Sequence, residues 1–328
     1  MKKMIQGSDK LPVGAVATTV GLCTLANAFN AIGFSGIRHL VMWFALIVWV
    51  LTISKIVLHF DTFKKEYTQV VPGSLYAAVM MLTAILSSYI YPYLPILGIG
   101  MWYVAVVVHA AHILFFTWRN VIREFNLNTF LPSWFVTYVG ILVPVVVGTA
   151  YGNPIILKAL LGYGFVISAI LVPAMFIRIL KLGMASQTEL MKTIFLAPPS
   201  LCLVSYFNLT AQPNMMLVTF LYALICLIFL YILKSLPNFV NRPFDGTFAA
   251  LTFPMAISLI ATLNTARFLI NVGHTAPGNF FNQVFGAKLF LITLVIGYVV
   301  YHFTHNFVLA TVKKPVAKAS IEEVEVVE

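Results

Sequence analysis

The sequence predicts an all-α integral membrane protein with ten transmembrane helices. Of the 328 residues, 61% are hydrophobic and 9% are charged, and the mean hydropathy is +0.95. Soluble domains carry about 25% charged residues. Only helices and closed barrels satisfy their backbone in lipid, and a spanning helix needs roughly 20 apolar residues. Because the apolar runs are long and strict alternation is absent, helices are favoured.

Ten apolar spans can be drawn along the chain. Short turns and longer loops alternate between them, which predicts five helical hairpins. Pro12, Pro72 and Pro132 precede odd-numbered spans at intervals of about 60 residues, and Pro243 precedes the ninth; this indicates a repeated hairpin, although proline is common at helix starts. The approximate bounds of the spans are 13–31, 39–58, 74–91, 97–118, 133–151, 154–177, 193–210, 214–233, 245–266 and 284–308.

The basic residues gather on one side of the predicted bundle. Sixteen of the twenty lysines and arginines lie in or next to the N-terminus, the four long loops and the C-terminal tail; the other four are Arg38, Lys158, Arg267 and Lys288. The positive-inside rule therefore predicts cytoplasmic termini and a multi-pass protein of the plasma (inner) membrane. We expect a transmembrane domain over 1–312, a mobile cytoplasmic tail over 313–328, and no nucleic-acid partner, because the basic residues are scattered between apolar runs.

The odd-numbered spans are predicted to form an inner layer. They carry hydroxyl, amide, glycine and proline residues, including Pro144 and the pair Pro198–Pro199, whereas spans two, eight and ten are mostly large and apolar. Helices that line water keep hydroxyls and broken backbone, and helices that face lipid do not. Close helix packing also explains the glycines, but it explains the proline pair less easily.

The ninth span, GTFAALTFPMAISLIATLNTA, has the clearest inner character. Pro254 has no N–H, so the carbonyl of Ala250 loses its helical donor and the helix bends. Pro254, Ser258 and Thr262 fall on one stripe of a regular helix. In an unbroken helix, Phe253 lies roughly 140° from Ser258.

The ionisable residues narrow the function. No acidic residue lies in the middle of a span, which argues against a cation channel and carboxylate-based proton coupling. Lysine and arginine are missing from mid-span too, so we expect an anion to meet hydroxyl dipoles and kinked backbone instead of a fixed charge. His109 and His112 have metal-ligand spacing but no third ligand, so interhelical hydrogen bonds are favoured. We expect no metal or other cofactor and, without nucleotide, hydrolase or protease motifs, no enzyme.

Four stretches resemble a known family. They are LPVGAVATTVGLCTL (11–25), TFLPSWFV (129–136), LAPPSLCLVSY (196–206) and TFPMAISLIATLN (252–264). Their order and spacing resemble those of the bacterial tellurite-resistance protein TehA and the plant slow-type anion channels, whose wider family includes fungal malate and sulfite carriers. The resemblance implies five hairpins around a central pore, with pseudo-fivefold symmetry, in a homotrimer with one pore per protomer.

The resemblance also implies that Phe253 plugs the pore as its gate; ordinary packing against a neighbouring helix is the alternative. Relatives often carry a kinking proline where Thr19 and Leu82 stand, and Gly21 is expected to supply the kink in the first span. The other expected kinks are Pro144, Pro198, Pro199 and Pro254, and the expected pore-lining residues are Val16, Thr19, Thr137, Ser205, Ser258 and Thr262.

The expected function is a passive channel for small anions such as chloride or nitrate. The alternative is a carrier for C4-dicarboxylates such as malate, or for sulfite or tellurite-related anions. A carrier for a dianion ordinarily needs a fixed cationic partner in its path, and the candidate is Arg267, which lies at the outer end of the ninth predicted span. This favours a channel.

Overall fold

The fold is entirely helical over the residues that the structure describes. The computed structural model describes residues 2–312, and the predicted tail at 313–328 lies outside the described residues. Within 2–312, nine helical stretches are long and apolar enough to cross a membrane, and a further apolar stretch, Trp134–Val147, is shorter. The prediction of an all-helical protein that crosses the membrane several times is therefore confirmed.

The helices follow one another through short connections. Among the short elements, η2 is a π-helix and the other η elements are 3-10 helices. In chain order the elements are α1 (Lys2–Gln6), η1 (Ser8–Lys10), α2 (Val13–Ala31), α3 (Ser35–Leu58), α4 (Phe60–Thr68), α5 (Val70–Leu75), α6 (Ala77–Ile90), α7 (Pro95–Thr117), η2 (Trp118–Arg123), α8 (Trp134–Tyr138), η3 (Gly140–Leu142), α9 (Val143–Val147), α10 (Pro154–Leu182), η4 (Ser186–Leu196), α11 (Ala197–Leu209), α12 (Met215–Val240), η5 (Gly246–Leu251), α13 (Phe253–Asn271) and α14 (Thr275–Val312).

Successive stretches alternate between the inside and the outside of the bundle. In Val13–Ala31, Val70–Ile90, Ser186–Leu209 and Gly246–Asn271, between 72% and 83% of the most apolar window is buried. In the other five long stretches, the buried share lies between 17% and 39%. The long odd-numbered segments therefore lie inside, as their hydroxyls and prolines predict, and the even-numbered helices cover them.

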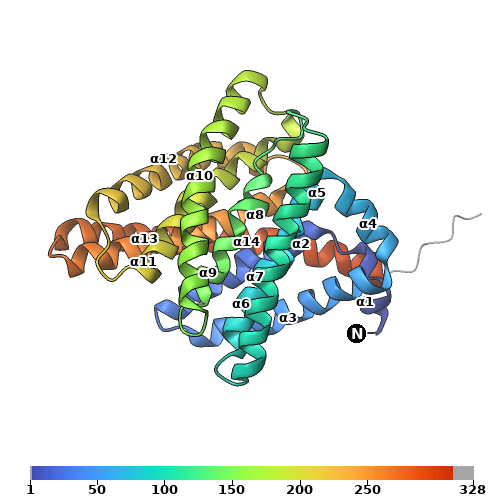
Figure 1. The fold of residues 1–328 in the computed structure, drawn as a ribbon, viewed down its shortest axis with the longest axis horizontal. Helices are drawn as coiled ribbons and strands as arrows, with labels where there is room; N and C mark the ends of the chain where they lie inside the picture. The colour runs from blue at the N-terminus through green and yellow to red at the C-terminus, as the bar shows by residue number, and fades with distance from the viewer. Residues whose placement is uncertain (1, 313–328) are drawn as a thin grey trace, which may run out of the picture.

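The inner segments contact one another in a closed ring. α2 packs against α6, α6 against α9, α9 against α11, α11 against α13, and α13 against α2. Each long outer helix also contacts the inner segment that precedes it, as α14 contacts α13 (Figure 1). Near the start of the chain, Lys10 Nζ donates a hydrogen bond of 2.7 Å to the carbonyl of Ala310 in α14. The two ends of the described chain therefore lie together.

Four of the five inner segments are broken. The third breaks at Tyr76, between α5 and α6. The fifth is divided into α8, η3 and α9 and ends at Val147, so it is also shorter than the predicted span 133–151. The seventh and ninth segments change from 3-10 helix to α-helix. Pro144, Pro198 and Pro254 lie in the first turn of the α-helical parts, where proline is well tolerated because the N–H groups of a first turn have no partner within their own α-helix.

The first and third segments depart from the expected pattern. α2 continues as an α-helix through Thr19 and Gly21, so the helix is not interrupted at Gly21. α6 likewise continues through Leu82, and the third segment breaks earlier, at Tyr76. No proline or glycine stands at Tyr76 itself, which is why the break could not be located from the sequence.

Side chains from neighbouring segments serve carbonyl groups at the breaks. The carbonyl of Ala250, which loses its helical donor at Pro254, accepts a hydrogen bond of 2.8 Å from Thr193 Oγ1 in η4. The carbonyl of Ser74, next to the break in the third segment, accepts one of 3.0 Å from Thr137 Oγ1 in α8. Non-helical backbone at membrane depth is tolerated where the protein buries and satisfies it. The breaks in the third and ninth segments are therefore each held by an adjacent segment.

We predict that Thr193→Val lowers the thermal unfolding temperature of the detergent-solubilised protein. The change keeps the side-chain shape but leaves the buried carbonyl of Ala250 without its side-chain donor, which costs about 1–3 kcal/mol. Thr265→Val is the matched control, because the hydroxyl of Thr265 donates within its own helix, to the carbonyl of Ala261. Equal unfolding temperatures for the two variants would contradict this role of Thr193.

Candidate functional site

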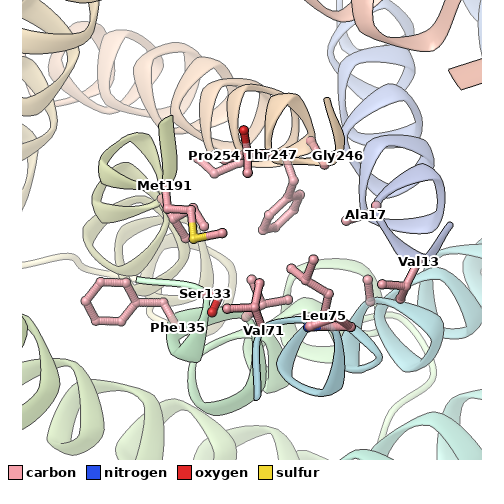
Figure 2. Close-up of a pocket in the computed structure, with 18 of the residues that line it drawn as sticks. Val13, Ala17, Val71, Leu75, Ser133, Phe135, Met191, Gly246, Thr247 and Pro254 are labelled. Carbon is pink, nitrogen blue, oxygen red and sulfur yellow. The ribbon is translucent and has the colours of Figure 1, made fainter. Parts of the chain in front are cut away.

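The five inner segments surround a cavity of about 430 Å³. In Figure 2, Pro254 and Thr247 lie across an open space from Val71 and Leu75, with Met191 at one side. The inner segments contribute Val13, Gly14, Ala17 and Val20 (α2); Val71, Pro72, Leu75, Ala78 and Met81 (α5, α6); Phe135, Val136 and Gly140 (α8, η3); Gln187, Thr188, Met191, Ile194, Ala197 and Leu201 (η4, α11); and Gly246, Thr247, Ala249, Ala250, Phe253 and Pro254 (η5, α13).

The cavity has a rim of residues around the starts of the inner segments and an apolar floor. We define the rim as Pro12, Glu66, Ser133, Gln187 and Asp245, which lie at or before the starts of the inner segments. The floor is formed by residues farther along each inner segment, and these are largely shielded from solvent. The floor residues are Val20, Met81, Gly140, Leu201 and Phe253.

Phe253 is the aromatic residue of the floor. It is the first residue of α13, directly after the break at Thr252, and 8% of its surface is exposed. Ser258 and Thr262 lie on the other face of α13, where their oxygens contact α14. The break precedes Phe253, so Phe253 and Ser258 lie on the same regular helix. The angle of about 140° between their side chains, expected for an unbroken helix, therefore applies.

Glu66 lies at the rim but is neutralised by a buried lysine. Lys55 Nζ of α3 is 2.6 Å from Glu66 Oε1, and only 2% of the lysine side chain is exposed. Lys55 also donates to the carbonyl of Leu11, at 2.8 Å, and Tyr76 Oη donates to Glu66 Oε2 at 2.7 Å. The carboxylate therefore joins the start of the first inner segment to the break in the third.

Asp245, the second carboxylate of the rim, is also paired. Its Oδ2 lies 3.0 Å from Arg242 Nη2, and its Oδ1 accepts hydrogen bonds from the backbone N–H and the hydroxyl of Thr247. This arrangement caps η5 and fixes the start of the segment that carries Phe253. Both acidic groups that line the cavity therefore have a cationic partner.

The hydroxyls expected to line the pore do not line this cavity. Thr19, Ser258 and Thr262 donate instead to carbonyl groups of their own helices. Val16 is buried between helices, and Ser205 Oγ is buried with no hydrogen-bond partner in the described part of the chain. Of the expected pore residues, Phe253 and Pro254 line the cavity. The others outside its lining are Gly21, Pro144, Pro198, Pro199 and Thr137.

Thr137 instead joins α8 to two histidines of α7. Its carbonyl lies 2.9 Å from His109 Nε2, and its hydroxyl lies 3.3 Å from His112 Nε2. His112 Nδ1 is hydrogen bonded to the hydroxyl of Tyr67, at 2.6 Å. Burial raises the pKa of Tyr67, against the effect of nearby Arg119, so the phenol stays protonated at neutral pH. The prediction of interhelical hydrogen bonds for the histidines is confirmed.

Gly21 brings the first inner helix against the break in the ninth segment. A Cβ atom at Gly21 would lie 2.6 Å from the backbone nitrogen of Phe253 and 2.7 Å from the carbonyl carbon of Thr252. Real Cβ atoms do not approach backbone so closely, so this position requires glycine. Gly21 therefore allows α2 to lie directly against the start of α13, although it does not interrupt α2.

The expectation that no lysine lies beside the middle of a span was wrong. Lys288 is part of α14 and 5% exposed, and its Nζ contacts Ser258 and Thr262 on α13. Ser258 is near the midpoint of Gly246–Asn271. Sequence reasoning began the tenth span at 284 and so left Lys288 near its end. The sequence could have placed Lys288 inside the span, because apolar sequence continues on both sides of it, over Thr275–Thr311.

A family model described as SLAC1, voltage-dependent anion channel, matches residues 10–305. The chain belongs to this family. Membership confirms the resemblance to TehA and the plant channels, and it implies anion channel or transporter activity in a membrane. Among curated proteins, none matches the chain.

We predict that Gly21→Ala destabilises this family member by about 1–3 kcal/mol, because the new methyl group would overlap the backbone of Thr252 and Phe253. The thermal unfolding temperature in detergent measures the loss. Gly162→Ala is the control, since a Cβ there meets no atom within 4 Å and alanine favours the helix. If Gly21→Ala is as stable as the control, the close contact does not exist.

Proposed function

We propose that the chain is an anion channel whose path runs between the five inner segments and is occluded by Phe253. The observation that carries this proposal is that all five segments converge on one cavity whose floor contains Phe253. The closed ring of contacts between α2, α6, α9, α11 and α13 supports a central path in a pseudo-fivefold arrangement of five hairpins.

The chemistry of the cavity suits anions that lose water easily. Its walls are mostly apolar, so they provide little to replace a tightly held hydration shell. Its two carboxylates are paired with Lys55 and Arg242, which removes most of the repulsion that a free acidic group would exert on an anion. Small monovalent anions such as chloride or nitrate fit this environment better than strongly hydrated dianions.

Beyond the floor, the proposed path is closed over a short distance. A second hollow, of about 490 Å³, lies between the far ends of α11 and α13, and its lining includes Asn208, Asn264 and Arg267. On α11, Leu201 at the floor and Asn208 are separated by about 10 Å at 1.5 Å per residue. Ser205, one turn beyond Leu201, keeps its buried hydroxyl unpartnered among the described residues and is available to an anion in this interval.

The topology and assembly belong to the same proposal. The rim lies at the end of the bundle where most lysines and arginines are found in the loops, so the cavity opens to the cytoplasm of a plasma (inner) membrane. Family membership supports a homotrimer with one path per protomer. In this arrangement the far hollow, with Arg267, faces outward.

We predict that Phe253→Ala produces a large anion current in planar bilayers, at least tenfold above that of the wild type, because it removes the aromatic ring from the floor. Reversal potentials in chloride and nitrate gradients measure the current and its selectivity. Phe248→Ala is the control: Phe248 is also a buried phenylalanine of the ninth segment, but it packs against Phe244 and does not line the cavity.

Three results distinguish the alternatives. Current in Phe253→Ala alone supports a channel gated at this residue. Saturable uptake of malate or sulfite into vesicles, without conductance in either protein, would establish a carrier and overturn the channel. Equal currents in Phe253→Ala, Phe248→Ala and the wild type would show that Phe253 is not the gate.

A further inference from the structure

Lys288 is a buried lysine next to an inner helix. Its Nζ donates hydrogen bonds of 2.9 Å to Thr262 Oγ1 and 3.2 Å to the carbonyl of Ser258, and it lies 4.3 Å from the centre of the Phe229 ring in α12. The lysine is 5% exposed. It therefore lies enclosed between α12, α13 and α14, on the side of α13 that faces the outer helices.

No carboxylate pairs with the amine of Lys288 within the described residues. The ion pairs there are Lys55–Glu66, Lys192–Glu189 and Arg242–Asp245, and none includes Lys288. Lys55 is similarly buried but forms an ion pair with Glu66, so the two buried lysines differ in whether a carboxylate lies next to the amine. A charged side chain in the middle of a membrane is costly and marks function by default.

Lys288 lies beside the stretch of the proposed path that is closed, between the cavity floor and the far hollow. Along α13, Ser258 and Thr262 lie between Phe253 at the cavity floor and Asn264 at the far hollow. A helix is about 10–12 Å in diameter, so a charge behind α13 lies about that far from a path in front of it. Apolar surroundings screen such a charge weakly, so its field reaches the path.

We propose that Lys288 is a selectivity-determining residue: in its ammonium form it favours anions over cations in the interval beyond Phe253 through the field that it exerts across α13. A unit charge about 10 Å from a monovalent ion, at an effective dielectric constant of about 20, changes the occupancy of the path by that ion on the order of tenfold. The hydrogen bonds to Ser258 and Thr262 fix the ammonium group against the helix. This inference rests on the proposed anion path.

The test separates the effect of the charge of Lys288 from that of its hydrogen bonds, using substitutions of Lys288 in the Phe253→Ala protein. Lys288→Met removes both, Lys288→Gln keeps a donor without the charge, and Lys288→Arg keeps the charge. Lys158→Gln is the control, because Lys158 is an exposed lysine on the outer helix α10. The measurement is the chloride-to-potassium permeability ratio from reversal potentials in potassium chloride gradients, together with chloride efflux from vesicles.

We expect the permeability ratio to fall by up to about a hundredfold in Lys288→Met and Lys288→Gln, because the charge acts about tenfold on each ion and with opposite signs, and to stay within twofold in Lys288→Arg and Lys158→Gln. A ratio in folded Lys288→Gln equal to that of Lys158→Gln would overturn the role of Lys288, while chloride flux in the background protein still supports the path. Absence of chloride current and efflux from the Phe253→Ala protein would overturn the path and the role of Lys288 together.

Discussion

The constraint on which the rest of the structure depends is that broken backbone inside a membrane must be satisfied by protein. A segment that changes direction or helix type leaves carbonyl groups without donors, and lipid supplies none. Here Thr193 serves the carbonyl of Ala250, and Thr137 serves that of Ser74, so the breaks in the ninth and third segments are each held by a neighbouring inner segment. The inner segments are therefore coupled through their irregular positions, while the regular outer helices isolate them from lipid.

The same constraint explains where the cavity ends. The ninth segment changes from 3-10 to α-helix at Thr252, and the missing side chain of Gly21 lets that turn lie directly against α2. In the proposed channel, Phe253 follows immediately and occupies the floor of an apolar cavity whose two acidic groups are paired. A closure built this way depends on one aromatic ring, whereas the surrounding backbone is fixed by hydrogen bonds and close packing.

Much of this arrangement could be predicted from the sequence, because hydropathy, loop charge and proline positions report directly on spans and breaks. The inner character of the ninth segment and the position of Pro254 at its break follow from local chemistry. The break at Tyr76 and the pairing of Glu66 with Lys55 depend on contacts between distant segments, which local sequence does not record. Hydroxyl residues in a span do not by themselves identify the lining of the cavity, because Thr19 and Ser258 donate to carbonyl groups of their own helices. Lys288 was misplaced because α14 extends well beyond the predicted span.

The central claim is that Phe253 separates the cavity from the rest of the path, and thiol accessibility tests it most directly. On α2, Val13, Ala17 and Val20 line the cavity, and Thr24 is the next residue on that face, one turn beyond the floor. With the three native cysteines replaced, cysteine is introduced at Ala17 or Thr24, and a small anionic thiol reagent is applied from the side of the rim. The account predicts that Ala17→Cys reacts in every background and that Thr24→Cys reacts at least tenfold faster when Phe253 is alanine. Equal reaction of Thr24→Cys with Phe253 present or absent would contradict it.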